Sequence, residues 1–163
     1  MTIGKRMALQ DAEYIALAEF RYQLRRFSRH MEEQVRKLGV NPQQYQVVLA
    51  VRGLPHGQAP TVGRLAERMQ LNHNTMVELV DRCEHAGLLQ RARSDADRRQ
   101  VRLTLTTQGE ALLRQLGWAA REELQSSGPA LVDAVRRLTQ GAARKPLSRM
   151  NERRRGGSRK ASP

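Results

Sequence analysis

The segment from residue 61 to residue 105 constrains the fold of this chain most strongly. Two short amphipathic helical patterns flank a tight turn at Met69-Gln70-Leu71-Asn72. Gly87 and a strand-like run over 88–93 follow, and a second alternating strand over 100–105 comes after a polar, arginine-rich tip. This order predicts a helix-turn-helix followed by a β-hairpin wing, an arrangement that places one helix in a DNA groove.

Start and stop signals predict the helices that precede this segment. A long amphipathic helix is expected over 12–38, and Gly39 suits its left-handed end. Asn41 then caps a second helix, with Pro42 at its first position and Gln44 completing a capping box. The first helix carries one apolar stripe: Leu17, Phe20, Leu24, Phe27, Met31, Val35 and Leu38. The second helix is expected to bury Tyr45, Val48 and Leu49.

The two helices of the helix-turn-helix have their own caps. Thr61 is expected to cap the third helix and Asn72 the fourth, which runs over about 73–86, and Gly87 supplies a left-handed exit. Leu88 is expected to pack back on the end of the fourth helix. The inward set of the two helices and the wing is Val62, Leu65, Ala66, Met69, Met76, Leu79, Val80, Cys83, Val101, Leu103 and Leu105.

Two more helices are expected after the wing. Thr107 and Glu110 form a capping box that opens a fifth helix, which runs to about residue 125. The run Ser126-Ser127-Gly128-Pro129 is expected to break it, and a short sixth helix follows over about 129–140. The fold class expected is therefore mainly α (α+β).

The charge is strongly basic and unevenly placed. The net charge of the 163 residues is +13, of which the arginine-rich segment 141–163 supplies +7 and the first 140 residues +6. We expect 141–163 to be a disordered basic tail that adds nonspecific DNA affinity or serves only solubility. Positive surfaces attract phosphate, and the low aromatic content of 4% argues against a single-strand binder with stacking platforms.

The face of the fourth helix opposite its apolar residues holds the candidate base contacts. Such a helix approaches base edges with its N-terminal turns. Asn74 can bond an adenine edge, Val77 a thymine methyl, and Glu78 a cytosine amino group, while Arg82 can reach guanine or phosphate. The alternative is an ordinary solvated helix face. The DNA-binding residues predicted on this helix are Asn72, His73, Asn74, Thr75, Val77, Glu78 and Arg82.

The wing tip provides the second candidate DNA contact. Arg98 and Arg99 stand at the end of a thin hairpin, which suits the narrow and electronegative minor groove. Asp97 would repel phosphate if it were free, so we expect it to hold an arginine through a paired hydrogen bond. The alternative is an ordinary charged turn between two strands.

No enzymatic constellation is present in the sequence. The four histidines are scattered without metal-ligand spacing, and there is no phosphate-binding glycine loop or G-x-S-x-G elbow. We therefore expect a protein that is not an enzyme and has no cofactor or metal. The single cysteine, the absence of an apolar run of membrane-spanning length and the absence of a signal segment indicate a cytoplasmic protein. Cys83 is expected to be a buried apolar residue and not a redox sensor.

Three runs of the sequence resemble the MarR family of bacterial winged-helix transcriptional regulators. They are VGRLAERM at 62–69, LVDRCEHAGLL at 79–89 and DRRQVRLTLTTQG at 97–109, and the resemblance extends over about 13–140. It implies a single winged-helix domain over 12–140, with a DNA-binding lobe at about 41–106. It also implies a helical dimerisation domain built from both chain ends, over about 12–38 and 107–140. In this family Arg99 would enter the minor groove and Asp97 would hold it.

The resemblance further implies a homodimer that binds double-stranded DNA at a pseudo-palindromic operator, represses transcription and releases DNA when a small aromatic or lipophilic effector binds. The long apolar stripe of the first helix independently favours a dimer, since it exceeds what one small core requires. An effector pocket is expected between the dimer helices and the DNA-binding lobe, near Tyr14, Phe20, Tyr45 and Trp118, which could equally be core residues. Two alternatives stay open: a sequence-indifferent architectural DNA-binding protein, and a winged-helix module that binds protein.

Overall fold

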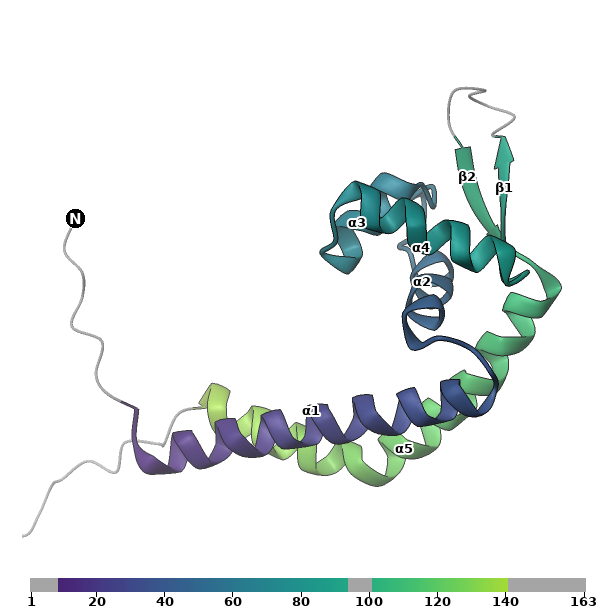
Figure 1. The fold of residues 1–163 in the computed structure, drawn as a ribbon. Helices are drawn as coiled ribbons and strands as arrows, with labels where there is room; N and C mark the ends of the chain where they lie inside the picture. The colour runs from purple at the N-terminus through teal and green to yellow at the C-terminus, as the bar shows by residue number, and fades with distance from the viewer. Residues whose placement is uncertain (1–8, 94–100, 141–163) are drawn as a thin grey trace, which may run out of the picture.

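The computed structural model describes residues 9–93 and 101–140 as a small lobe standing on two long helices. The elements are α1 (Asp11–Lys37), α2 (Pro42–Arg52), α3 (Val62–Met69), α4 (His73–His85), β1 (Leu89–Arg93), β2 (Val101–Leu105) and α5 (Thr107–Gln140). Figure 1 shows α2, α3, α4 and the β1–β2 hairpin in the lobe, with α1 and α5 side by side beneath it. The predicted class, a mainly helical winged helix-turn-helix with a helical region from both chain ends, is confirmed.

The predicted caps of the three lobe helices are confirmed. The Asn41 side chain accepts a hydrogen bond from the Gln43 N–H at 2.8 Å, and the Gln44 side chain accepts one from the Asn41 N–H at 3.1 Å. The Thr61 hydroxyl caps α3, and Asn72 Oδ1 accepts from the Thr75 N–H at 2.8 Å at the start of α4. These bonds satisfy backbone donors that have no partner within a helix, so the sequence defines where each helix begins.

The turn between α3 and α4 is tight because Gln70 adopts a left-handed conformation, with φ 56°. This conformation lets the Leu71 N–H donate to the Ala66 carbonyl at 2.9 Å, which closes the end of α3. Asn72 then starts α4 without any further connecting residue. The orientation of the second helix is therefore set within three residues of the end of the first.

The lobe encloses a continuous apolar core to which every element of the lobe contributes. Leu65, Leu79, Leu103 and Leu88 are almost completely buried there, beside Val47 and Val48 from α2. Met76, Leu79, Val80 and Cys83, the predicted inward face of α4, are each at most 1% exposed. The inward face predicted for α4 is thus confirmed, and the opposite face of the helix is left for other contacts.

Two predictions about apolar residues in the lobe were wrong. Leu49 is exposed, and Val47 takes the buried position on α2, because α3 and α4 pack on the side of α2 that carries Val47 and Val48. Val101 is also exposed, whereas Leu103 is buried and Leu105 half-buried. The hairpin projects beyond the lobe in Figure 1, so its outer end has no core to pack against.

The prediction of a break at 126–129 was also wrong, because α5 runs unbroken past Pro129. The ring lies on an exposed part of the helix, so the backbone carbonyl that loses its N–H partner there can bond water. The neighbouring Ser127 hydroxyl donates to the Glu123 carbonyl at 2.9 Å. α1 lies beside α5 on both sides of the proline, near Glu123 and near Ala134, and this packing outweighs the local preference for a break.

The start of α5 also differs from the prediction, because Thr106 and not Thr107 is its cap. The Thr106 hydroxyl accepts a hydrogen bond from the Gly109 N–H at 3.1 Å and donates to the Gly87 carbonyl at 2.5 Å. A Cβ on Gly109 would lie 2.2 Å from the Leu88 carbonyl oxygen, so only glycine fits this contact. These contacts join the beginning of α5 directly to the end of α4 and the start of β1.

Candidate nucleic-acid interface

The outer face of α4 is the principal surface that the fold leaves for a partner. The inner side chains of this helix are buried against α2 and α3, which fixes its rotation. His73, Asn74, Glu78 and Arg82 are exposed, and Thr75 and Val77 are half-buried. The structure therefore brings six of the predicted contact residues together on and beside the solvent side of one helix.

Some of these side chains are already engaged within the protein. Asn72 caps α4 with its side-chain oxygen Oδ1, and its side-chain nitrogen Nδ2 can still donate a hydrogen bond. Arg82 Nε donates to the Glu78 carbonyl at 3.3 Å, and His85 Nδ1 lies 2.7 Å from the Asp81 carbonyl oxygen. The N-terminal half of α4 carries Asn74 and Glu78 without such side-chain bonds to other described residues, and this half is the end that suits base contacts.

An arginine that the sequence analysis did not single out lies beside the acidic residues of α4. Arg91 of β1 contacts Glu84 through Nη1 and Asp81 through Nη2, the latter at 2.5 Å. These bonds raise the pKa of Arg91, chiefly through the hydrogen bond to Asp81. The sequence did not indicate this pairing, because the acids lie on the helix and their partner lies on the strand that follows it.

The wing is present as an antiparallel hairpin. Leu89 pairs with Leu105, Arg91 with Leu103 and Arg93 with Val101. The Leu103 N–H donates to the Pro60 carbonyl at 2.8 Å, which ties the hairpin to the loop before α3. The predicted contact residues Asp97, Arg98 and Arg99 lie outside the described residues, as does the predicted basic tail over 141–163.

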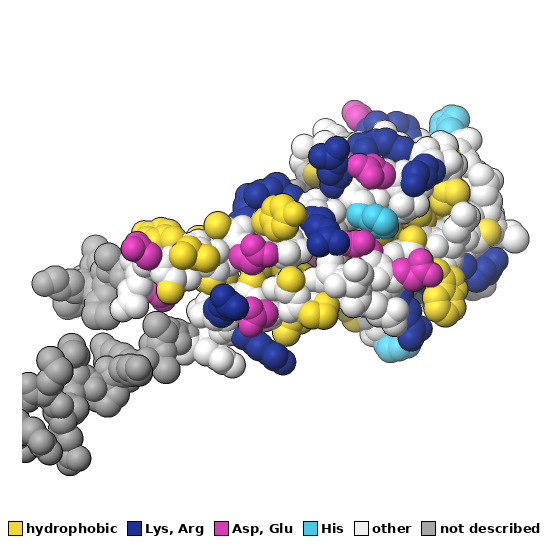
Figure 2. Space-filling view, turned by 90° about the horizontal axis from the view of Figure 1, so that it is seen from below, with side chains coloured by type: hydrophobic (Ala, Val, Ile, Leu, Met, Phe, Trp, Pro, Cys, Tyr) yellow, Lys and Arg dark blue, Asp and Glu magenta, His cyan; other side chains and the backbone are white. Residues whose placement is uncertain are grey.

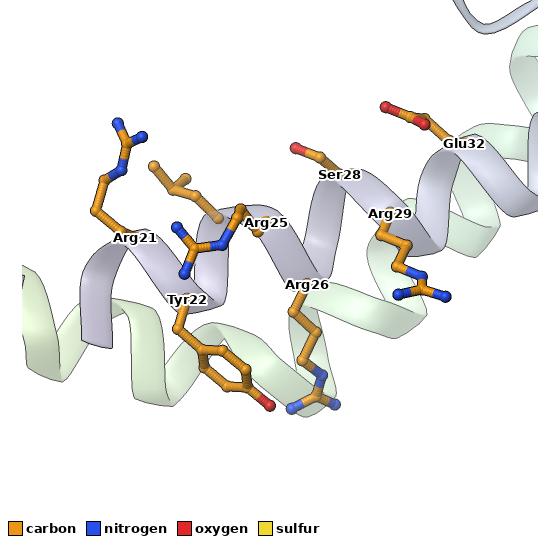
Figure 3. Close-up of a pocket in the computed structure, with 8 residues that line it drawn as sticks. Arg21, Tyr22, Arg25, Arg26, Ser28, Arg29 and Glu32 are labelled. Carbon is orange, nitrogen blue, oxygen red and sulfur yellow. The ribbon is translucent and has the colours of Figure 1, made fainter. Parts of the chain in front are cut away.

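The four residues predicted around an effector pocket lie in different surroundings. Tyr14 and Trp118 are exposed, Phe20 is half-buried and Tyr45 is buried in the lobe core. A separate recess of about 780 Å³ lies along α1, as Figure 3 shows. None of the four lines this recess, whose described lining is Arg21, Tyr22, Leu24, Arg25, Arg26, Ser28, Arg29 and Glu32.

Cys83 is buried inside the lobe, as its place among the apolar residues of α4 predicts. Burial raises the pKa of its thiol to about 12, and the neighbouring Arg82 only partly opposes this shift. Its Sγ lies 3.8 Å from the Gln44 carbonyl oxygen. Since the thiolate is the reactive form, a buried thiol with so high a pKa is a poor nucleophile at neutral pH.

Within 9–93 and 101–140, no three His, Cys, Asp or Glu side chains converge as metal ligands. None of the helices in the described ranges combines the length and the apolar character that crossing a bilayer requires.

The helix-turn-helix, the hairpin and the exposed outer face of α4 define a winged-helix protein with an additional pair of long helices. Residues 38–100 match the sequence model of the MarR family. Over this region the chain is similar to MarR family proteins.

The curated relatives found are named transcriptional regulators. The organic hydroperoxide resistance transcriptional regulator of Bacillus subtilis (strain 168) is 35% identical over 92 residues, or 54% of this chain and 60% of that protein. The HTH-type transcriptional repressor MdtR of the same organism is 34% identical over 80 residues, or 49% of this chain and 50% of that protein. The chain spans about half the length of the curated relatives it matches.

A solved structure supports the same fold. A mutant of MepR from S. aureus, bound to an oligodeoxyribonucleotide, superposes with a TM-score of 0.57 at 20% sequence identity. The superposition covers 69% of this chain and 80% of that chain. The similarity therefore includes elements beyond the region that matches the family in sequence.

Proposed function

We propose that this chain is a sequence-specific double-stranded DNA-binding transcriptional regulator. The observation that carries the proposal is the exposed outer face of α4 on a helix whose inner face is fully buried. Asn74 and Glu78 would read base edges in the major groove, with Arg82 on guanine or phosphate. The hairpin would follow the neighbouring minor groove, with the predicted contacts of Asp97, Arg98 and Arg99 at its tip.

We further propose that the protein acts as a homodimer built through α1 and α5. Large apolar side chains stay exposed on both helices, and Figure 2 shows hydrophobic groups distributed along this pair. On α1 they lie away from the buried residues Ala16 and Gln23, so a second chain would cover them. A two-fold dimer would place two α4 helices about 34 Å apart, one turn of DNA, on a pseudo-palindromic operator. The exposed apolar residues are Tyr14, Ile15, Leu17, Tyr22, Leu24, Trp118, Leu124, Val132 and Val135.

Repression and its control by a small ligand complete the proposal. The name of the relative MdtR describes a repressor, which favours the same role here. The recess along α1 combines Tyr22 and Leu24 with several arginines, so it suits a small aromatic ligand that carries negative charge. We propose that such a ligand lowers the affinity for DNA, and that the protein is not an enzyme.

The decisive experiment is selection of bound duplexes from randomised DNA and genomic fragments with the wild-type chain. A specific reader should bind its selected duplex about 10³-fold or more tightly than random DNA. Equal affinity for both would indicate an architectural DNA-binding protein, and absence of binding to any duplex would indicate a protein-binding module. Either result would overturn the proposal.

A substitution on α4 tests the proposed reading face on the selected duplex. Asn74→Ala should weaken binding by about 1–3 kcal/mol and relax the preference at one base pair. His85→Ala, at the exposed C-terminal end of the same helix, is the matched control and should leave the base preference unchanged. If the two variants behave alike, the N-terminal half of α4 does not read the sequence.

A further inference from the structure

Arg91 adds side-chain and backbone hydrogen bonds between α4 and β1, two elements that a short turn connects in the sequence. Its backbone N–H donates to Glu84 Oε1 at 3.1 Å, and its guanidinium contacts the other oxygen of the same carboxylate. The same guanidinium reaches Asp81 Oδ1, one turn earlier on α4. One residue of β1 therefore holds two successive acids of α4 through three contacts.

The burial and charge of this cluster favour a well-defined geometry. The Arg91 side chain is 31% exposed, and the side chains of Asp81 and Glu84 are also partly covered. Charge-assisted bonds from a planar guanidinium to two carboxylates restrict the direction of the arginine more than single surface ion pairs do. The cross-strand partner of Arg91 is Leu103, which is buried in the core. The cluster therefore fixes β1 on its α4 side, while the core fixes the neighbouring strand.

Asp81 and Glu84 do not stabilise α4 itself. Asp81 and Glu84 lie in the C-terminal half of α4, where negative charge opposes the helix dipole. They also bring negative charge to the helix that is proposed to meet DNA. Neither effect benefits α4 or DNA binding directly, so the contact with the strand is the role that explains both acids.

We propose that Arg91 is a positioning residue, which holds the β1–β2 hairpin at a fixed angle to α4 so that the two elements enter adjacent DNA grooves together. This inference rests on the proposed function. Without the Arg91 contacts, α4 would still fit the major groove, and the hairpin would no longer be held in register with the minor groove. The loss would appear as a missing contact on DNA and not as an unfolded lobe.

The sharpest test is the double variant Asp81→Ala/Glu84→Ala, because two explanations predict opposite signs. Removing two negative charges near DNA should strengthen binding if the acids act only through their charge. If they position Arg91, binding to the duplex selected by the wild-type chain should fall about 10-fold or more, or about 1.4 kcal/mol. Hydroxyl-radical footprinting should show loss of the minor-groove protection from the hairpin, while protection of guanine N7 from dimethyl sulfate in the major groove should be retained.

Variants of Arg91 test whether the geometry of its guanidinium or only its positive charge is needed. Arg91→Gln should lose the same minor-groove protection, whereas Arg102→Gln removes an exposed arginine from the neighbouring strand and should retain it. Arg91→Lys keeps the positive charge without the planar two-sided contact and should behave like Arg91→Gln. If circular dichroism shows that the double variant does not melt cooperatively, and so is not folded, the footprint of Arg91→Lys tests the positioning role instead.

Tighter binding of the double variant with an intact footprint, or an intact footprint for Arg91→Lys, would overturn the inference. Failure of the wild-type chain to select any duplex would instead overturn the proposed function.

Discussion

The lobe and the α1–α5 pair differ in how they bury their side chains. Every lobe element contributes apolar residues to one closed core, and α4 is buried along its whole inner face. In the helical pair, the C-terminal half of α1 joins that core through Met31 and Val35, whereas Leu17 and Leu24 in its N-terminal half are exposed. The buried side chains described between the two long helices include the polar residues Gln23 and Ser127.

A single chain buries the apolar residues of the lobe core, whereas it leaves large apolar residues of the α1–α5 pair exposed. Glu123 of α5 lies 3.6 Å from Arg26 and 3.8 Å from His30, and Gln23 Oε1 is buried without a hydrogen-bond partner among the described atoms. Polar groups in such a layer fix how two helices align but contribute little net stability. We therefore expect substitutions in the lobe to change folding, and substitutions on the exposed apolar face to change assembly.

The largest effect is expected in the lobe core. Leu79→Ala removes a side chain that is 1% exposed and should lower the free energy of unfolding by about 2–5 kcal/mol. Leu49→Ala, on the exposed side of α2, should change it by less than about 0.5 kcal/mol. Chemical denaturation followed by circular dichroism measures both. Similar values for the two variants would contradict a core that a single chain completes.

A matched pair of charged substitutions tests whether the exposed apolar residues of the α1–α5 pair form a dimer interface. Leu17 and Leu49 are 41% and 42% exposed in a single chain, but only Leu17 lies on the proposed dimer face. Leu17→Asp should weaken dimerisation on the order of 100-fold, because it would bury a charge at the interface. Leu49→Asp should leave the oligomeric state unchanged.

Light scattering after size-exclusion chromatography over a dilution series measures this effect. A wild-type chain that is monomeric at micromolar concentration would refute the proposed dimer. If the wild-type chain is a dimer and Leu17→Asp leaves it intact, the dimer interface lies on another face of the protein.

Two glycines of α5 provide a smaller and sharper test of how the regions are joined. Gly109→Ala would force a Cβ against the Leu88 carbonyl oxygen and should cost on the order of 1–3 kcal/mol of stability. Gly117→Ala meets no atom within 4 Å and should raise stability by about 0.5–1 kcal/mol, because glycine weakens a helix interior. Thermal melts compare the two, and a stabilising Gly109→Ala would show that this junction is loose.

The smallest effect concerns Cys83. Burial raises the pKa of its thiol from 9.0 to about 12, so the folded protein holds this proton more tightly than the unfolded chain. The stabilising contribution is therefore complete below pH 9 and declines as the pH rises toward 12. In the native protein the thiol should react slowly with a disulfide reagent, and in denaturant it should react fully. Rapid labelling of the native protein, or a Cys83→Ala variant with the same alkaline decline, would contradict this account.

Local chemistry in the sequence determined most of the lobe. Caps at Asn41, Thr61 and Asn72 and the left-handed Gly87 define helix ends through bonds within a few residues, so they could be predicted. The spacing of Met76, Leu79, Val80 and Cys83 likewise defined which side of α4 is buried and, by exclusion, which side carries Asn74 and Glu78. The proposed DNA-reading face is thus largely a consequence of helical periodicity.

Tertiary packing decided the features that depend on residues distant in sequence. The continuity of α5 through Pro129, the exposure of Leu49 and Val101, and the use of Thr106 as a cap each depend on which element lies alongside. Arg91 meets Asp81 and Glu84 only because the chain reverses after α4 and lays β1 against the helix. Periodicity and capping are properties of a few adjacent residues, whereas the partner of an exposed charge or of an apolar face is set by the approach of separate elements.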